Sequence, residues 1–122
     1  MNKTAKDAVE LYLNACYEGN GEMINQAFHE SAHLYSLDAD KALSDELRDE
    51  FAQHIDTPPS AKTLNAPREE EILMIDFSGE DTAIAKVAML AHGTLYTDYL
   101  FLGRIQGDWK IVSKFYTGKK KE

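Results

Sequence analysis

The chain has 122 residues, of which 43% are hydrophobic and 28% charged, and its net charge is −8. These values are typical of one globular domain, residues 1–122, and exclude a disordered, fibrous or two-domain chain. Residues 1–61 hold 4 Lys and Arg against 12 Asp and Glu. So acidic a half repels phosphate backbones and anionic lipids, which excludes nucleic acids and membranes as expected partners.

The N-terminus and the cysteine count predict the compartment of the protein. The chain opens directly into amphipathic sequence without the apolar segment of a signal peptide, and no apolar run approaches the ~20 residues that span a bilayer. A single cysteine, Cys16, excludes an internal disulfide and favours a reducing compartment. We expect a cytoplasmic protein in which Cys16 is a small buried side chain.

The N-terminal quarter predicts two helices. Thr4 and Asp7 resemble a capping box, and apolar residues then recur at helical spacing as far as Glu18. Gly19-Asn20-Gly21 ends this helix, because Gly and Asn tolerate the left-handed conformation. A shorter helix follows, with an apolar face that reaches Phe28.

A strand and a third helix are predicted next. Residues 32–37 alternate as a strand does. Ser44 is expected to cap a helix whose apolar stripe is Leu47, Phe51 and Ile55. The pair Pro58-Pro59 ends that helix, and residues 57–67 form a long loop of the kind that rims a pocket.

The remaining chain predicts a meander of antiparallel strands. Residues 72–77 are apolar on both faces, which indicates a strand covered on both sides. Residues 83–91 alternate, with one face rich in alanine. Residues 93–116 form a hairpin whose first arm is so long that it must twist and bend. Helices first and strands last predict an α+β fold, in which a curled antiparallel sheet packs against three N-terminal helices.

Four segments carry a resemblance to a known family: Val9–Leu13, Ala27–Ala32, Asp98–Leu102 and Gly107–Phe115. They resemble the nuclear transport factor 2-like superfamily and, within it, the bacterial "Putative lumazine-binding" family. Glu30-Ser31 departs from the Pro-Asp that is usual there. The resemblance implies a cone, also called a cystatin-like roll, with a pocket between the helices and the concave sheet, usually in homodimers. The superfamily includes isomerases, dehydratases, SnoaL-like polyketide cyclases and binding proteins without catalysis.

Tyr12 and Asp98 are the main candidates for chemistry. They are similar to the tyrosine and protonated aspartate that bind the oxyanion in ketosteroid isomerases, where an apolar site keeps the carboxyl neutral. The catalytic base of those enzymes has no clean counterpart, since the nearest positions are Tyr35, Ser36 and, in the turn beyond, Asp38. Two roles therefore remain open for Tyr12 and Asp98: acid–base catalysis, or lining the pocket as polar groups.

Asp98 also has a purely structural explanation. If Ile105-Gln106-Gly107 is a three-residue hairpin loop, Asp98 faces Lys114 and the two form a cross-strand ion pair. A two-residue Gly107-Asp108 turn would separate them. We expect the three-residue loop.

The histidines and Trp109 are not expected to form a metal site. His29 and His33 have the spacing of two metal ligands on one helical turn, but the helix ends between them and no third ligand follows, so we expect no metal site and no cofactor. His29 is kept as a candidate hydrogen-bonding or catalytic group near the end of the second helix. His54 and His92 are expected in solvent, and Trp109 as a packing anchor.

Taken together, these patterns favour a small-molecule binding protein with a mostly apolar pocket for an aromatic heterocycle or another apolar metabolite. Two alternatives remain: an acid–base isomerase or lyase without a metal, and an interaction domain with a filled core. Because the outer face of the sheet is also apolar, we expect a homodimer through that face. The expected pocket residues are Tyr12, Phe28, Tyr35, Phe51, Met89, Asp98, Leu100 and Lys114.

Overall fold

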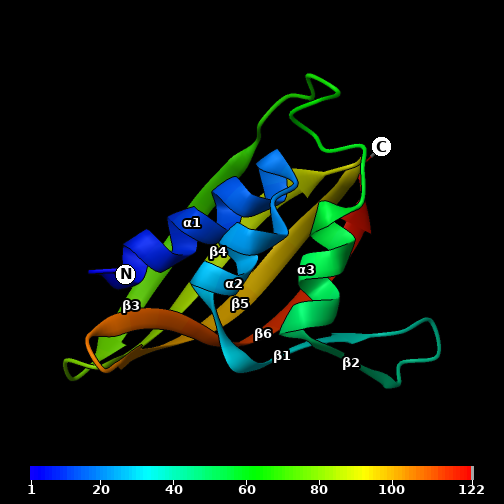
Figure 1. The fold of residues 1–122 in the computed structure, drawn as a ribbon. Helices are drawn as coiled ribbons and strands as arrows, with labels where there is room; N and C mark the ends of the chain where they lie inside the picture. Colours follow the sequence, from blue (N-terminus) through cyan, green and yellow to red (C-terminus); the bar gives the residue numbers. More distant parts are fainter. Residues whose placement is uncertain (122) are drawn as a thin grey trace.

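In the computed structural model, which describes residues 1–121, three helices cover one side of a single curled sheet (Figure 1). The sheet order is β2-β1-β6-β5-β4-β3, with β1 and β6 parallel and every other pair antiparallel. The elements are α1 (Ala5–Glu18), α2 (Gly21–Ala27), β1 (Phe28–Leu37), β2 (Leu43–Leu47), α3 (Arg48–Asp56), β3 (Glu70–Ser78), β4 (Thr82–Ala91), β5 (Thr94–Ile105) and β6 (Asp108–Lys120). The predicted α+β class with a curled, unclosed sheet is confirmed.

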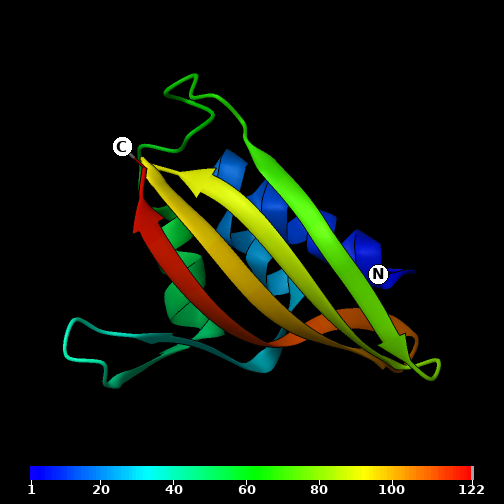
Figure 2. The same cartoon turned by 180° about the vertical axis from the view of Figure 1, so that it is seen from behind.

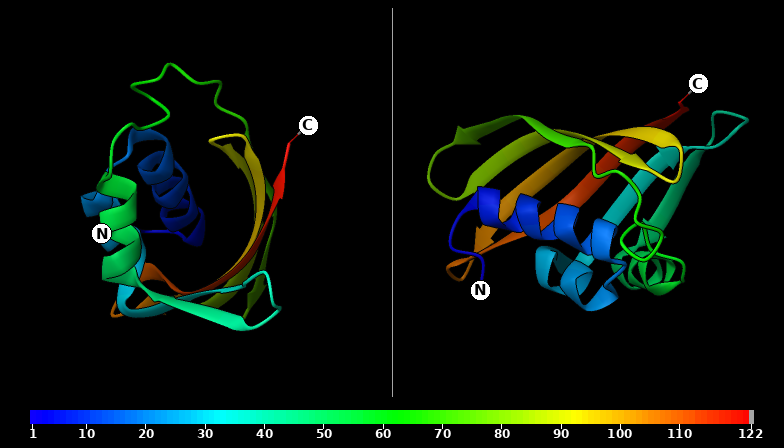
Figure 3. Two further views of the ribbon diagram at one scale, coloured as in Figure 1. Left: turned by 90° about the vertical axis from the view of Figure 1, so that its right-hand side faces the viewer. Right: turned by 90° about the horizontal axis from the view of Figure 1, so that it is seen from above.

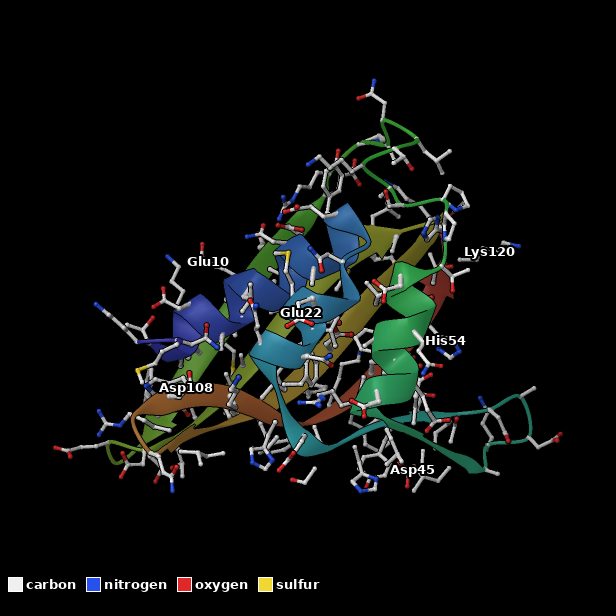
Figure 4. All side chains as sticks on the ribbon, in the orientation of Figure 1. Glu10, Glu22, Asp45, His54, Asp108 and Lys120 are labelled. Carbon is white, nitrogen blue, oxygen red and sulfur yellow. The ribbon has the colours of Figure 1, made fainter. Side chains whose placement is uncertain are left out.

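The sheet curves around the helices rather than lying flat beneath them. Figure 2 shows its long strands from behind, and Figure 3 shows the helices lying across the concave side. The inner face of β4 and β5 carries the core, including Ala85, Val87 and Leu100, each 0% exposed. Small side chains on β4 allow α1 to lie close to the sheet, as the alanine-rich pattern predicts. The acidic Glu10 and Glu22 lie exposed on the outer surface of α1 and α2 (Figure 4).

Local signals determine α1 as predicted. The Thr4 hydroxyl accepts from the Asp7 amide, and the Asp7 carboxylate accepts from the Thr4 amide, which completes the capping box. Gly19 ends the helix with φ 68°, in the left-handed region. Asn20 then caps α2 by accepting from the Met23 amide at 3.2 Å.

The third helix begins later than predicted. Residues 43–47 form β2, an edge strand in which Ser44 pairs with Ser36 of β1, so Ser44 does not cap a helix. His33 Nδ1 lies 2.8 Å from Asp45 Oδ1 across this pair. Backbone pairing with β1 therefore outweighs the local capping signal, and α3 starts at Arg48. Phe51 and Ile55 still pack against the core from α3, but Leu47, the first residue of the predicted stripe, ends β2 and is 49% exposed.

The expectation that residues 72–77 are covered on both sides is wrong. They belong to β3, the edge strand, and Leu73 and Met74 are 46% and 41% exposed. The pairing with β4 shifts between Ile72 and Met74, so one extra residue stands in the strand. This bulge breaks the alternation, and apolar side chains consequently fall on the outer face as well as the inner one.

The hairpin between β5 and β6 has a different turn from the one expected. Ile105 pairs with Asp108, and Gln106 and Gly107 both have positive φ, 51° and 83°, so the loop has two residues. The three-residue loop is wrong, and so is the pairing that it implied. Asp98 lies opposite Tyr116, whereas Lys114 lies opposite Leu100, because the register shifts between Phe101 and Leu102.

Candidate functional site

A cavity of about 200 Å³ lies between the helices and the concave face of the sheet. Its wall combines α1, α3 and the inner faces of β4, β5 and β6, and the connection from α3 to β3 contributes to its rim. The interaction-domain alternative expected this space to be filled by side chains, which the structure does not bear out. The lining residues are Tyr12, Leu13, Cys16, Tyr17, Phe51, Ile55, Ala61, Arg68, Glu69, Glu70, Met89, Leu90, Ala91, His92, Tyr96, Asp98, Lys114 and Tyr116.

Three buried polar side chains form a hydrogen-bonded chain in the cavity wall. The Lys114 ammonium donates to Tyr12 Oη at 2.8 Å, and Tyr12 Oη donates to Asp98 Oδ2 at 2.5 Å. Tyr12 and Asp98 are each 1% exposed and Lys114 is 4% exposed. A buried charge is costly unless it is paired or hydrogen-bonded, and here Tyr12 connects a cation to an anion.

Aromatic rings surround the buried ammonium. Lys114 Nζ lies 4.4 Å from the ring centre of Phe51, 4.6 Å from that of Tyr116 and 4.9 Å from that of Tyr12. The electron-rich faces of aromatic rings attract a cation, and the attraction is stronger away from water. The charged group is therefore held by one hydroxyl and three rings, without a direct ion pair to Asp98.

Burial also determines the protonation state of Tyr12 and Cys16. The pKa of the Tyr12 phenol is raised well above its ordinary value, chiefly by burial and then by the negative charge of Asp98. Burial raises the pKa of the Cys16 thiol to about 12, although Lys114 lowers it in part. Both groups are neutral at physiological pH, so Tyr12 keeps the proton that it donates to Asp98.

That single phenolic proton limits the chemistry of Tyr12. A ketosteroid isomerase-type site needs this hydroxyl to donate to the substrate, whereas here it donates to Asp98. A phenol has one proton, so it cannot donate to a ligand while this bond persists. Within this hydrogen-bonded chain, the groups left for a ligand are the remaining Lys114 N–H bonds and the Asp98 carboxylate.

The structure brings some of the expected site residues together and places others elsewhere. Tyr12, Phe51, Met89, Asp98 and Lys114 line the cavity, and their role in binding stays a prediction. The other expected residues do not line it. Phe28 and Leu100 are core residues with 0% exposure, Tyr35 stacks on His33 at 5.8 Å, and His29 lies in β1, where its Nδ1 is 2.8 Å from Ser31 Oγ.

Tyr96 and Tyr116 are cavity residues outside the set that the sequence predicts for the pocket. Each lies two positions from a member of that set, Asp98 in β5 or Lys114 in β6. Alternation along a strand puts such neighbours on one face, so this signal was present in the sequence. At the rim, Ala61 belongs to the loop that was expected to border a pocket. No pattern marks Arg68, which donates to Glu70 Oε1 at 2.7 Å, or His92, which is exposed.

The family model described as "Putative lumazine-binding" matches residues 1–117. The chain belongs to this family. A search of curated proteins found no significant match. None of the helices in residues 1–121 is long and apolar enough to cross a membrane.

Solved structures similar to this member of the "Putative lumazine-binding" family share its fold. A nuclear transport factor 2-like protein of unknown function from Shewanella baltica OS155 has a TM-score of 0.85 and 22% identity, over 96% of this chain and 92% of that one. A nuclear transport factor 2-like protein of unknown function from Methylobacillus flagellatus KT has a TM-score of 0.78 and 26% identity, over 94% and 89%. A cystatin-like fold protein from Burkholderia xenovorans LB400 has a TM-score of 0.67 and 15% identity, over 96% and 90%.

Proposed function

We propose that this protein binds a small, uncharged, planar aromatic heterocycle in the cavity between its helices and its sheet. The observation that carries the proposal is the buried chain Lys114–Tyr12–Asp98 in the wall of a cavity that is otherwise mostly apolar and aromatic. Small-molecule sites characteristically combine an apolar wall with a few convergent polar groups. The family description, "Putative lumazine-binding", is consistent with a heterocyclic ligand.

The size of the cavity favours a heterocycle over a steroid. Sites for drug-sized ligands usually measure about 300–1,000 Å³, and this cavity measures about 200 Å³. A two-ring molecule suits that volume, while a four-ring steroid would leave much of its surface in water. Charge supports the same choice, because Lys114 and Asp98 balance one another inside the cavity and neither is left to neutralise an ionic ligand.

Thermal unfolding with a ligand panel tests the proposal. A ligand that binds only the folded state stabilises it by about 2.7 kcal/mol at 100 times its Kd, which raises Tm by several degrees. We expect a rise with lumazines or pterins and none with steroids. No rise with any heterocycle would contradict the proposal.

A pair of matched variants locates the binding site. Ala91 lines the cavity, whereas Ala88 lies on the outer face of the same strand, opposite Thr97. Ala91→Phe should fill the cavity and abolish the ligand-induced rise in Tm, and Ala88→Phe should leave it intact. Equal ligand responses in the two variants would contradict binding in this cavity.

We also propose that two copies of the chain associate through the outer face of the sheet. Apolar side chains gather there on neighbouring strands, with exposed fractions from 42% to 47% for Leu95, Tyr99, Phe101 and Phe115. Contiguous exposed apolar surface of this kind is uncommon on monomers and typical of interfaces. Sedimentation velocity at micromolar concentration should give a dimer, and a monomer at all concentrations would contradict this proposal.

A further inference from the structure

The buried polar chain leaves two N–H donors and one acceptor atom unused. An ammonium carries three N–H bonds, and the only hydrogen bond of Lys114 Nζ within the described residues is the one to Tyr12 Oη. Asp98 Oδ2 accepts from Tyr12, while Asp98 Oδ1 is buried and has no hydrogen-bond partner among residues 1–121. Both side chains line the cavity.

An unpartnered buried carboxylate oxygen needs a physical explanation. Leaving such an acceptor without a hydrogen bond destabilises the folded state, and more so for a charged group, so folded proteins contain few of them. Tyr12 cannot supply the missing donor, because its one O–H already donates to Oδ2, the other oxygen of the same carboxylate. A ligand N–H or O–H would complete the coordination of Asp98 Oδ1.

The two unused groups also lie near one another. Tyr12 Oη is within hydrogen-bond distance of both Lys114 Nζ and Asp98 Oδ2, although the cation and the anion form no direct ion pair. A ligand group that approaches this point therefore meets an N–H donor and a carboxylate acceptor together. The complementary group carries its own acceptor and donor on adjacent atoms, and it is uncharged, because a carboxylate would meet Asp98 and an amine would meet Lys114.

We propose that the cavity recognises the lactam edge of a planar heterocycle, in which a ring carbonyl lies beside a ring N–H. Lys114 donates to the carbonyl oxygen, and Asp98 Oδ1 accepts from the ring N–H. The rings of Phe51, Tyr12 and Tyr116 lie around the Lys114 ammonium and supply flat apolar surface for the ring that bears the lactam. This inference rests on the proposed function and adds the chemical group that the site selects.

Isothermal titration calorimetry of the full chain with three probes tests the assignment. The probes are lumazine (pteridine-2,4-dione), 6,7-dimethyllumazine, which keeps both ring N–H groups, and 1,3-dimethyllumazine, in which both are methylated. Loss of a hydrogen bond to a charged group is worth about 1.5–3 kcal/mol, which corresponds to a tenfold to hundredfold change in Kd. We expect the first two probes to bind at least tenfold more tightly than 1,3-dimethyllumazine.

Two variants separate hydrogen bonding from steric exclusion. Asp98→Asn replaces the charged acceptor by a neutral amide of the same size, whose hydrogen bond is weaker, so the preference for lumazine over 1,3-dimethyllumazine should fall at least threefold. Met89→Ala changes the apolar wall and should raise the Kd of both probes by the same factor. If the preference survives unchanged in Asp98→Asn, the N-methyl groups are excluded by shape and the assignment to Asp98 is overturned.

The binding results distinguish failure of the lactam inference from failure of the proposed function. Equal binding of lumazine and 1,3-dimethyllumazine to the unmodified protein would overturn the lactam inference but support a heterocycle site. Binding of indole, which has no carbonyl, without binding of any lumazine would likewise overturn the lactam inference and support a heterocycle site. Binding of none of these molecules would overturn both the lactam inference and the proposed function.

Discussion

Replacement of Lys114 by methionine tests whether the buried polar chain holds the fold together. Met keeps most of the length and the apolar stem of Lys but removes the ammonium that donates to Tyr12 and lies over three aromatic rings. Asp98, 1% exposed, then keeps only the neutral Tyr12 hydroxyl as a partner. The variant therefore contains a buried carboxylate without a compensating cation.

The size of the effect follows from that uncompensated charge. Removal of one member of a buried pair costs about 3–5 kcal/mol, because the other charge stays in an apolar environment. New contacts between the methionine and the rings offset only a small part of this cost, about 0.3–1.5 kcal/mol. We expect the free energy of unfolding to fall by about 3 kcal/mol, a large share of the roughly 5–15 kcal/mol that stabilises a typical domain.

Urea unfolding at pH 7 measures this change. Trp109, 4% exposed, gives a fluorescence signal that changes when the core opens. Lys86→Met is the matched control, because Lys86 lies over Tyr99 on the outer face of the sheet, 5.3 Å from the ring centre, and a contact of that kind is worth about 0.5–1 kcal/mol. The double variant Lys114→Met with Asp98→Asn removes the uncompensated charge and should regain at least half of the loss. Equal losses for the two single methionine variants, or no recovery in the double variant, would refute the reasoning.

Three other predictions follow from burial and surface character. Cys16 should react with iodoacetamide at pH 8 at least a hundredfold more slowly in the folded protein than in urea, since a pKa of about 12 leaves little thiolate; similar rates would show that burial does not protect the thiol. The folded-state pKa of Tyr12 lies above the unfolded value of about 10, so its contribution to stability is complete below pH 10 and is lost as pH rises further. Between pH 9 and pH 11 the free energy of unfolding in urea should accordingly fall less for Tyr12→Phe than for the unmodified protein. Equal falls would contradict the raised pKa of Tyr12. Phe101→Asp should shift sedimentation from dimer to monomer while Asp49→Lys, on the exposed surface of α3, does not, and a dimer that persists in Phe101→Asp would place the interface elsewhere.

Elements with local signals could be predicted from the sequence. The start and end of α1 depend on Thr4, Asp7 and Gly19, all within or next to the helix itself. The turn at His92-Gly93 likewise follows from two residues, whose φ values are 50° and 81°. In each case the hydrogen bonds and backbone conformations that set the element are made by neighbours in the chain.

Elements whose limits depend on distant partners could not be predicted in the same way. Ser44 has the side chain of a helix cap, but its backbone pairs with Ser36 of β1. The third helix is consequently displaced to Arg48 by a strand pairing that no local pattern indicates. The same reason applies to Tyr35, which was expected in the pocket. The face of the sheet on which its side chain lies depends on the parallel register of β1 against β6, and that register places it beside Phe115 on the outer face.

The site itself depends on one extra residue in β6. Ile111 lies opposite Leu102 and Ser113 lies opposite Phe101, so Val112 has no partner in β5. Strict alternation from the buried Ile111 would turn Ser113 inward and Lys114 outward, toward the exposed surface. The bulge at Val112 reverses this order, so that Ile111 packs in the core and Lys114 reaches Tyr12 from the same strand. Asp98 and Lys114 thus share the inner face, as the three-residue loop had implied, but they do so through a bulge rather than through direct pairing, and Tyr12 from α1 is needed to join them.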